Sequence, residues 1–315
     1  MTVAGAAASR STVELALRGK RRDVASRVFS GLLLSSLLLS LFILVALLVS
    51  VLVDAWPVLS TRGVDFLNGN LSRFESRAGV RQGLIGSLIL IGFVAVIAVP
   101  LGIAAAVYLQ EYARDTSRIN RVLIANIRNL AGVPSIVYGI LGLVVFAQAL
   151  RGITGPQSNG LSYISGGLTL AVLVMPFMII ITMEALRAVP RSIREAAYGV
   201  GATRWEVVRS HVLPYAAPGI FTGAILALAR AFGETAPLLV VGSVTGYLSA
   251  GGGGNVLETL QGPYTALPTI IFAWSREAGD EWAQLTAAAI VVLLVVILVV
   301  NLAAILLRNR YERKW

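Results

Sequence analysis

Two charged residues, Arg230 and Glu234, stand alone in the apolar stretch 219–243. If this stretch crosses a membrane as one helix, Arg230 lies near the bilayer centre, where an arginine costs about 2.5–3.5 kcal/mol on insertion scales. Glu234 follows four residues later on the same helix face and can pair with it. Because a guanidinium matches the oxygens of phosphate, the pair indicates an anion site. Glu234 would tune Arg230 or accept a proton from the anion. A structural ion pair is the alternative.

Three prolines fall inside apolar stretches and are expected to kink or weaken their helices. Pro237 follows the charged pair and lacks the amide hydrogen that would bond four residues back. Pro134 withholds this bond from the carbonyl of Leu130, and Pro176 lies in the next apolar stretch. Carbonyls freed at membrane depth are tolerated only where protein or water covers them. The positions suit helices that rock between two states, with static kinks as the alternative.

The elements that must position these residues follow from the composition. Of the 315 residues, 57% are hydrophobic and 13% charged, and the mean hydropathy is +0.80. A soluble domain has about 25% charged residues. A membrane-spanning helix needs about 20 mainly apolar residues. Six stretches qualify: 28–53, 83–110, 129–150, 167–183, 219–243 and 282–307. The sequence predicts an all-α integral membrane protein with six transmembrane helices.

The net charge of +10 is divided unevenly between the two sides of this protein. The segments 1–28, 111–128, 185–214 and 308–315 carry 19 of the 26 Lys and Arg residues, and the other side carries six. Lys and Arg concentrate on the cytoplasmic side of membrane proteins. Both termini are therefore predicted to be cytoplasmic, in a multi-pass protein of the cell (inner or plasma) membrane. Binding to nucleic acid is not expected.

Residues 1–28 are expected to form a cytoplasmic segment before the transmembrane domain, 29–315. Ser11 and Glu14 fit a capping box, and residues 11–27 place apolar side chains on one face. This predicts an amphipathic helix in contact with membrane lipid, with a disordered basic tail as the alternative. The stretch 28–53 is too long for the core of a cleaved signal peptide, so we expect it to be retained. Four glycines at 251–254 are expected to make an outer loop flexible.

The segment 192–214 is a loop whose sequence specifies two short helices. Ser192 with Glu195, and Thr203 with Glu206, form two capping boxes that each predict a helix start. Gly201 lies between them, where a helix commonly ends in a left-handed residue. A loop specified in this detail indicates a docking surface or, alternatively, a hairpin that lies on the membrane.

The second of these helices has an apolar face. Trp205, Val208 and Val212 share that face, and Pro214 is expected to end the helix. The face would contact a partner protein if the loop is a docking surface, and lipid if it is a surface hairpin.

Several kinds of site are excluded by residues that the sequence lacks. It has no Cys and a single His, His211, so thiolate chemistry and metal sites of Cys or clustered His are excluded. Around Lys20 there is no Walker A motif, because Glu14 holds the first glycine position and Arg21 the Ser/Thr position. No nucleophile elbow or HExxH occurs either. We expect no catalytic residue, no metal and no cofactor bound by this chain.

The loop resembles the EAA loop of ABC importer permeases. Glu195-Ala196-Ala197, Gly201 and Leu213-Pro214 match that motif in type and spacing, with His211 in place of the usual Ile. In that family the loop docks on an ATPase subunit and transmits its closure. The resemblance implies this role for Glu195, Ala196, Ala197, Gly201, Thr203, Trp205 and Glu206. ATP and Mg²⁺ would be bound by the partner ATPase.

The charged pair carries a second resemblance. Residues 230–239, Arg-Ala-Phe-Gly-Glu-Thr-Ala-Pro-Leu-Leu, are similar to the signature of the PstA-type permease of the phosphate ABC importer, as are residues 132–139 and 267–272. This implies a type I ABC importer permease fold and a substrate pathway for inorganic phosphate that contains Arg230, Glu234 and Thr235. The chain would be a non-catalytic subunit. Its partners would be an ATPase subunit dimer, a second homologous permease subunit and an extracytoplasmic phosphate-binding protein.

Three alternatives were weighed against phosphate import. Another oxyanion, sulfate or molybdate, is disfavoured because the carboxylate of Glu234 would repel a fully deprotonated anion but can accept a hydrogen bond from phosphate. A gradient-driven transporter would give the EAA-like loop no purpose. A membrane enzyme would need an acid–base cluster in its spans, where Arg230 and Glu234 are the only charged residues.

Overall fold

In the computed structural model, residues 24–113, 117–246, 248 and 255–311 are described, and these residues form helices and no strand. The all-α prediction is confirmed for this part of the chain. The predicted amphipathic helix at 11–27, except residues 24–27, and the glycines at 251–254 lie outside the described residues. The chain divides into two compact units, residues 1–50 and 51–315.

The first unit contains the N-terminal part of α2 (Val24–Asn68). Within this unit the apolar side chains of the helix are exposed; Leu33 is 57% and Leu44 is 63% exposed. A helix that is apolar on every side is stable only in lipid or under the cover of other protein. The predicted apolar stretch 28–53 is helical throughout and is part of this longer helix.

Among the described residues, five helices are long and apolar enough to cross a membrane, and the number is six if one bent pair counts as a span. The five are Ala25–Asn68, Arg81–Tyr112, Tyr163–Arg187, Arg204–Gly233 and Asp280–Leu306. The second of them consists of α3 (Arg81–Phe93), η2 (Val94–Ala98), α4 (Val99–Val107) and η3 (Tyr108–Tyr112). The third is α8 (Tyr163–Arg187), and the last belongs to α15 (Asp280–Tyr311).

The bent pair occupies the region of the predicted span 129–150. α5 (Arg118–Ala131) and the helix formed by α6 (Ser135–Gly142) and η4 (Leu143–Ala149) meet at 99°. Pro134 lies at the break, where its missing amide hydrogen removes the helical bond to the carbonyl of Leu130. The carbonyl of Leu130 accepts a hydrogen bond from the Tyr138 hydroxyl at 2.8 Å instead. The bend lies at Pro134, one of the three prolines at which the sequence predicts a kink.

The predicted span 219–243 also ends differently. α11 (Leu213–Gly233) stops ten residues before the predicted end, and the short helix α12 (Ala236–Val240) follows it. Pro237 stands in the first turn of α12, where its missing amide hydrogen leaves no helical bond unmade. Arg230 consequently lies in the last turn of α11 rather than at the middle of a span.

At its other end the same helix runs further than predicted. α10 (Arg204–Val207) and the π-helical turn η5 (Val208–Val212) lead directly into α11, so the helix passes through Pro214. The expectation that Pro214 ends this helix is wrong. The π-turn before Pro214 is wider than an α-helical turn and shifts the hydrogen-bond register of the helix. Such turns occur where the regular hydrogen bonding of a helix is interrupted.

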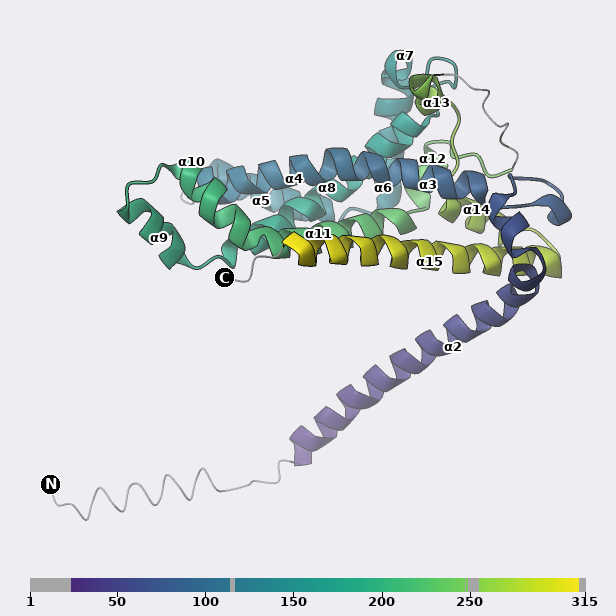
Figure 1. Ribbon diagram of the computed structural model, residues 1–315, viewed down its shortest axis with the longest axis horizontal. Helices are drawn as coiled ribbons and strands as arrows, with labels where there is room; N and C mark the ends of the chain where they lie inside the picture. The colour runs from purple at the N-terminus through teal and green to yellow at the C-terminus, as the bar shows by residue number, and fades with distance from the viewer. Residues whose placement is uncertain (1–23, 114–116, 247, 249–254, 312–315) are drawn as a thin grey trace. The chain divides into compact units, whose positions relative to one another are not determined.

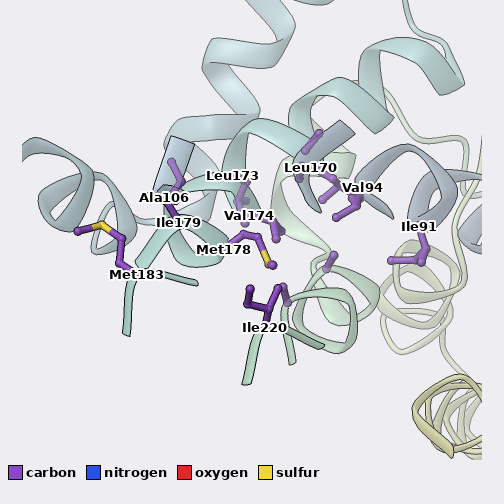
Figure 2. Close-up of a cluster of buried hydrophobic side chains, with 14 of the residues drawn as sticks. Ile91, Val94, Ala106, Leu170, Leu173, Val174, Met178, Ile179, Met183 and Ile220 are labelled. Carbon is purple, nitrogen blue, oxygen red and sulfur yellow. The ribbon is translucent and has the colours of Figure 1, made fainter. Parts of the chain in front are cut away.

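α8 lies at the centre of the packing in the second unit. Leu170, Val174 and Met178 of α8 are almost completely buried, in a cluster shared with α3, α4 and α11 (Figure 2). Small residues let the neighbours approach: a Cβ atom on Gly102 of α4 would stand 2.7 Å from Cγ of Met178. Close approach at small residues is the usual basis of helix packing in lipid.

A second buried cluster joins the C-terminal part of α2 to α14 (Leu267–Trp274) and α15. The Trp274 ring lies between those of Phe66 and Trp282, with centroids 6.3 and 5.6 Å away. Arg62, whose φ of −127° departs from the helix, donates hydrogen bonds to the carbonyls of Glu75 and Ala78. The short helix η1 (Glu75–Arg77) contacts α15, whereas α7 (Arg151–Thr154) and α13 (Val256–Gln261) lie elsewhere and are joined by the hydrogen bond from Nε2 of Gln261 to the carbonyl of Ile153 at 2.8 Å.

Figure 1 shows α3, α4, α8, α11 and α15 running side by side in the second unit. The hairpin of α9 (Arg191–Gly199) and α10 stands at one end of these helices, and α14 lies toward the opposite end. The loop 192–214 therefore leads into the first end of the helix Arg204–Gly233, and the charged pair lies at its other end.

Candidate functional site

Arg230 and Glu234 meet at the C-terminal end of α11. Nε of Arg230 lies 3.4 Å from Oε1 of Glu234, so the predicted ion pair forms, with a long hydrogen bond. The Arg230 side chain is 44% exposed and that of Glu234 only 16%. The guanidinium is thus held by its partner on one side and open on the other, where it can meet an anion.

An aromatic residue that sequence reasoning missed lies beside this arginine. The guanidinium carbon of Arg230 lies 5.6 Å from the ring centroid of Phe177 in α8, a cation–π distance. Phe177 directly follows Pro176, but no pattern in the sequence connects it to Arg230, because the contact joins separate helices.

Thr235 and Pro237 form the link from α11 to α12. Glu234 is in extended conformation (φ −75°, ψ 115°), and Thr235 follows as the residue before α12. Pro237 is buried against Gly139, where an added Cβ atom would stand 2.7 Å from Cα of Pro237. α6 and α12 therefore touch through their backbones, and the broken span 118–149 supports the segment that holds the charged pair.

A cavity lined by residues next to the pair is too small for an anion. It is lined by Ala231, Phe232 and Leu238 together with Leu90 and Ile91, and its volume is about 10 Å³. That is room for at most one water molecule. An anion at Arg230 would consequently bind on its exposed side, outside the packed interior of this chain.

The three prolines that were expected to kink helices occupy different positions. Pro134 lies at the 99° break between α5 and α6, and Pro237 lies in the first turn of α12. α8 continues as one helix through Pro176.

Among the described residues, no group of three or more His, Asp and Glu side chains could hold a metal ion.

The loop 192–214 forms the predicted helical hairpin, but with one cap instead of two. Thr203 and Glu206 form the complete capping box: the Thr203 amide donates to Oε2 of Glu206 at 2.7 Å, and the Glu206 amide donates to Oγ1 of Thr203 at 3.4 Å. The capping box predicted for Ser192 is absent, because α9 begins one residue earlier, at Arg191 after Pro190. Proline at the helix entry fixes the backbone there without a side-chain cap.

Gly201 makes the turn of the hairpin. Its φ is +85°, a left-handed conformation that side chains other than glycine and Asn rarely adopt. Nothing lies within 4 Å of the position a Cβ atom would take, so within this chain the backbone conformation alone requires glycine. Open space at this position also leaves the turn accessible to another protein.

The hairpin exposes most of the residues to which a docking role was assigned. Exposed side chains include those of Glu195, Ala196, Thr203, Trp205 and Glu206, whereas Ala197 is buried. Trp205 is 57% exposed, while Val208 and Val212 of the same helix are buried. Two further apolar residues, missed in the sequence, are exposed close by: Tyr198 at 48% and Val200 at 85%.

Known proteins resemble this chain in sequence over most of its length. Residues 98–314 match the family described as binding-protein-dependent transport system inner membrane component. The phosphate transport system permease protein PstA 1 of Mycobacterium tuberculosis (strain CDC 1551 / Oshkosh) is 34% identical over 290 residues, covering 91% of this chain and 90% of that relative. The phosphate transport system permease protein PstC of Mesorhizobium japonicum is 34% identical over 215 residues, covering 62% of this chain. The chain spans 65% of that second relative, just under two thirds.

Solved structures resemble the chain in fold. One is a chain of a bacterial alginate ABC transporter in complex with an alginate pentasaccharide-bound periplasmic protein, with a TM-score of 0.65 at 15% identity, over 91% of this chain and 96% of that one. Another belongs to the MetNI methionine ABC transporter in an inward-facing conformation, with a TM-score of 0.54 at 20% identity, over 75% and 95%. The expected permease fold is confirmed.

Proposed function

Because the chain belongs to the family of binding-protein-dependent transport system inner membrane components, we propose that it is the membrane-spanning permease subunit of an ATP-driven importer for inorganic phosphate. The observation that supports phosphate as the substrate is the 34% identity with a PstA 1 protein across 91% of the chain. The charged pair at Arg230 gives that similarity a chemical basis, since a guanidinium fork fits phosphate oxygens.

The half-exposed Arg230 supports a pathway on the surface of this chain. An arginine on a membrane-spanning helix faces water or protein rather than lipid. Its exposed side would therefore lie toward a water-filled pathway between this chain and a second, homologous permease subunit. Glu234, held at 3.4 Å, would accept a hydrogen bond from protonated phosphate, and Thr235 would offer a hydroxyl beside it.

The hairpin α9–α10 is the proposed docking element for the ATPase. Its exposed apolar residues Tyr198, Val200 and Trp205 flank the accessible turn at Gly201. An exposed apolar patch of this kind on a tightly specified loop is typical of a protein interaction site. The ATPase subunit dimer would bind ATP and Mg²⁺, and this chain would contribute no catalytic residue.

We further propose the orientation that the charge distribution indicates. Residues 111–112 contact α9 and α10, which supports a single, cytoplasmic side for the basic segments 111–128 and 185–214. On this basis both termini are cytoplasmic, residues 29–315 are the permease domain, and 1–28 is a cytoplasmic segment in contact with lipid. The extracytoplasmic phosphate-binding protein would deliver its ligand at the opposite end.

Transport then follows an alternating cycle. ATP binding closes the ATPase dimer, which displaces the hairpin and opens the pathway outward; hydrolysis returns it to the inward state. Arg230 compensates the charge of phosphate in passage, and its own pairing with Glu234 keeps the ion from being held tightly.

Uptake by the reconstituted complex tests this function. The chain is co-purified with its permease partner and ATPase, placed in vesicles with the binding protein, and ATP-driven uptake of labelled phosphate is measured with sulfate as competitor. We expect ATP-dependent uptake that excess sulfate does not inhibit. Uptake without ATP or without the ATPase, or inhibition by sulfate at concentrations comparable to phosphate, would overturn the proposal.

A further inference from the structure

Three consecutive residues at the end of the helix Arg81–Tyr112 each contact an arginine from a different element. The arginines belong to the end of α8, to α9 and to α10. The contacts are Gln110 Oε1 with Arg187 Nε at 3.1 Å, Glu111 Oε1 with Arg194 Nη2 at 2.7 Å, and the Tyr112 ring with the Arg204 guanidinium carbon at 5.1 Å. Both helices of the hairpin are thus attached to one short segment of a membrane-spanning helix.

The Arg194–Glu111 pair is the strongest of these attachments. The side chains are only 19% and 10% exposed, and a second contact joins Nε of Arg194 to Oε2 of Glu111 at 3.4 Å. Arg194 also donates to the carbonyls of Leu186 at 2.9 Å and Val189 at 2.8 Å. A two-point, largely buried pair of this kind has a fixed geometry, unlike an exposed pair, which contributes little.

The Tyr112–Arg204 contact adds an attachment on the second helix. A single contact point would let the hairpin pivot about it. Contacts on both α9 and α10 fix its orientation as well as its position. α9 and α10 are themselves joined by the rigid turn at Gly201 and the capping box at Thr203.

We propose that residues 110–112 are a positioning site that makes the hairpin α9–α10 and the helix Arg81–Tyr112 move as one rigid body during transport. This rests on the proposed function of the hairpin as the ATPase-docking element. The helix so moved carries Leu90 and Ile91, which line the small cavity together with Ala231 and Phe232, the residues that follow Arg230. A displacement at the hairpin would thereby reach the charged pair through a second helix, in addition to α11 itself.

Glu111→Gln isolates the coupling role from a structural one. The substitution removes the negative charge but leaves Arg194 free to keep its bonds to the two carbonyls, so the fold is retained. We expect the complex to assemble and to hydrolyse ATP, while phosphate uptake per ATP hydrolysed falls about fivefold or more. The matched control is Glu258→Gln, the same change on an exposed carboxylate of α13 that touches none of residues 110–112 or their arginines. It is expected to leave the ratio unchanged.

A covalent replacement of the pair provides the second test. Because the chain has no Cys, Glu111→Cys with Arg194→Cys introduces the only thiols, which a short bifunctional thiol reagent can join. We expect poor coupling before cross-linking and restored uptake per ATP after it, with the yield of cross-linked chain measured on a gel. If cross-linking stops uptake, the two elements move apart during the cycle and the proposal is wrong. Normal coupling in Glu111→Gln would also overturn it.

The two proposals fail in different ways. If the unaltered complex shows no ATP-driven phosphate uptake, the proposed function fails. If the unaltered complex transports phosphate but Glu111→Gln couples normally, or cross-linking stops uptake, the function stands and the positioning site fails.

Discussion

Gly139 of α6 and Pro237 of α12 lie in backbone contact, so that a Cβ atom on Gly139 would stand 2.7 Å from Cα of Pro237. This contact joins the broken span to the segment that carries Arg230 and Glu234. α12 follows the charged pair directly, and its position against α6 therefore decides where the pair points.

Gly139→Ala is expected to destabilise the chain, because the added methyl group meets backbone atoms that cannot move independently. Overpacking of this kind costs about 1–3 kcal/mol. Thermal unfolding of the purified complex in detergent measures it. Gly92→Ala is the matched control: nothing lies within 4 Å of its Cβ position, so the variant should be as stable as the native chain or slightly more stable. Equal stability of the two variants would contradict the packing described here.

Arg230→Gln is expected to abolish phosphate uptake while the complex still assembles, since the guanidinium is 44% exposed and supports little packing. Arg230→Lys should retain only part of the activity, because an ammonium cannot form the two parallel bonds of a guanidinium. Uptake in vesicles measures both. Arg276→Gln is the matched control, because Arg276 stacks on Phe272 at the same 5.6 Å that separates Arg230 from Phe177. Normal uptake in Arg230→Gln would remove this residue from the pathway.

Thr203→Ala and Ser192→Ala test two motifs that look alike in the sequence but differ in the structure. Thr203 caps α10 and Ser192 caps nothing, because α9 begins before it. Thr203→Ala should destabilise the hairpin by about 0.5–2 kcal/mol, and Ser192→Ala should have no measurable effect. Hydrogen exchange of the hairpin amides distinguishes them. Faster exchange in Ser192→Ala would show that the first predicted cap forms after all.

Gly201→Leu is expected to weaken binding of the ATPase, because leucine disfavours the φ of +85° at the turn by about 1–2 kcal/mol. Gly201→Asn is the informative companion, since Asn tolerates this conformation. The space around the turn is open, so Asn should preserve the hairpin and bind the ATPase better than Leu does. Co-purification with the ATPase gives the comparison; equal loss in both variants would mean that the partner requires the absence of a side chain.

Glu75 lies at the end of the bundle opposite the hairpin, and it makes the stability of the folded chain depend on pH. A hydrogen bond with the Glu281 carboxyl, some desolvation and the charge of Glu281 raise the pKa of Glu75 above its usual 4.5. The folded chain therefore keeps this proton to a higher pH than the unfolded chain. Stability from this group is present below pH 4.5 and is lost as the pH rises through the raised pKa. Glu75→Gln should remove this dependence, and unfolding midpoints at acidic and neutral pH would show whether it does.

Local properties of the sequence were sufficient for much of the architecture. The apolar stretches located the spanning helices, because a helix in lipid must be apolar over its own length. The Thr203–Glu206 cap and the left-handed Gly201 were correctly predicted, because each depends on residues within one turn. The pairing of Arg230 with Glu234 follows from their spacing of four residues.

Helix ends next to prolines were less predictable. α5 ends before Pro134 and α11 ends before Pro237, yet the helix continues through Pro214 and Pro176. Inside a helix a proline removes one hydrogen bond, but whether the helix breaks there depends on the surrounding contacts. Tyr138 replaces it at Leu130 and a π-turn precedes Pro214, and neither partner can be recognised from the proline alone.

The sequence by itself determined which segments enter the membrane, how the loop 192–214 turns and which two charges pair, because these depend on neighbours along the chain. Only the tertiary structure decided that Gly139 supports Pro237, that Phe177 stacks on Arg230, and that residues 110–112 hold the hairpin through Arg194 and Arg204. Those contacts join residues far apart in the chain, and they arise from how whole helices pack, which no local spacing records.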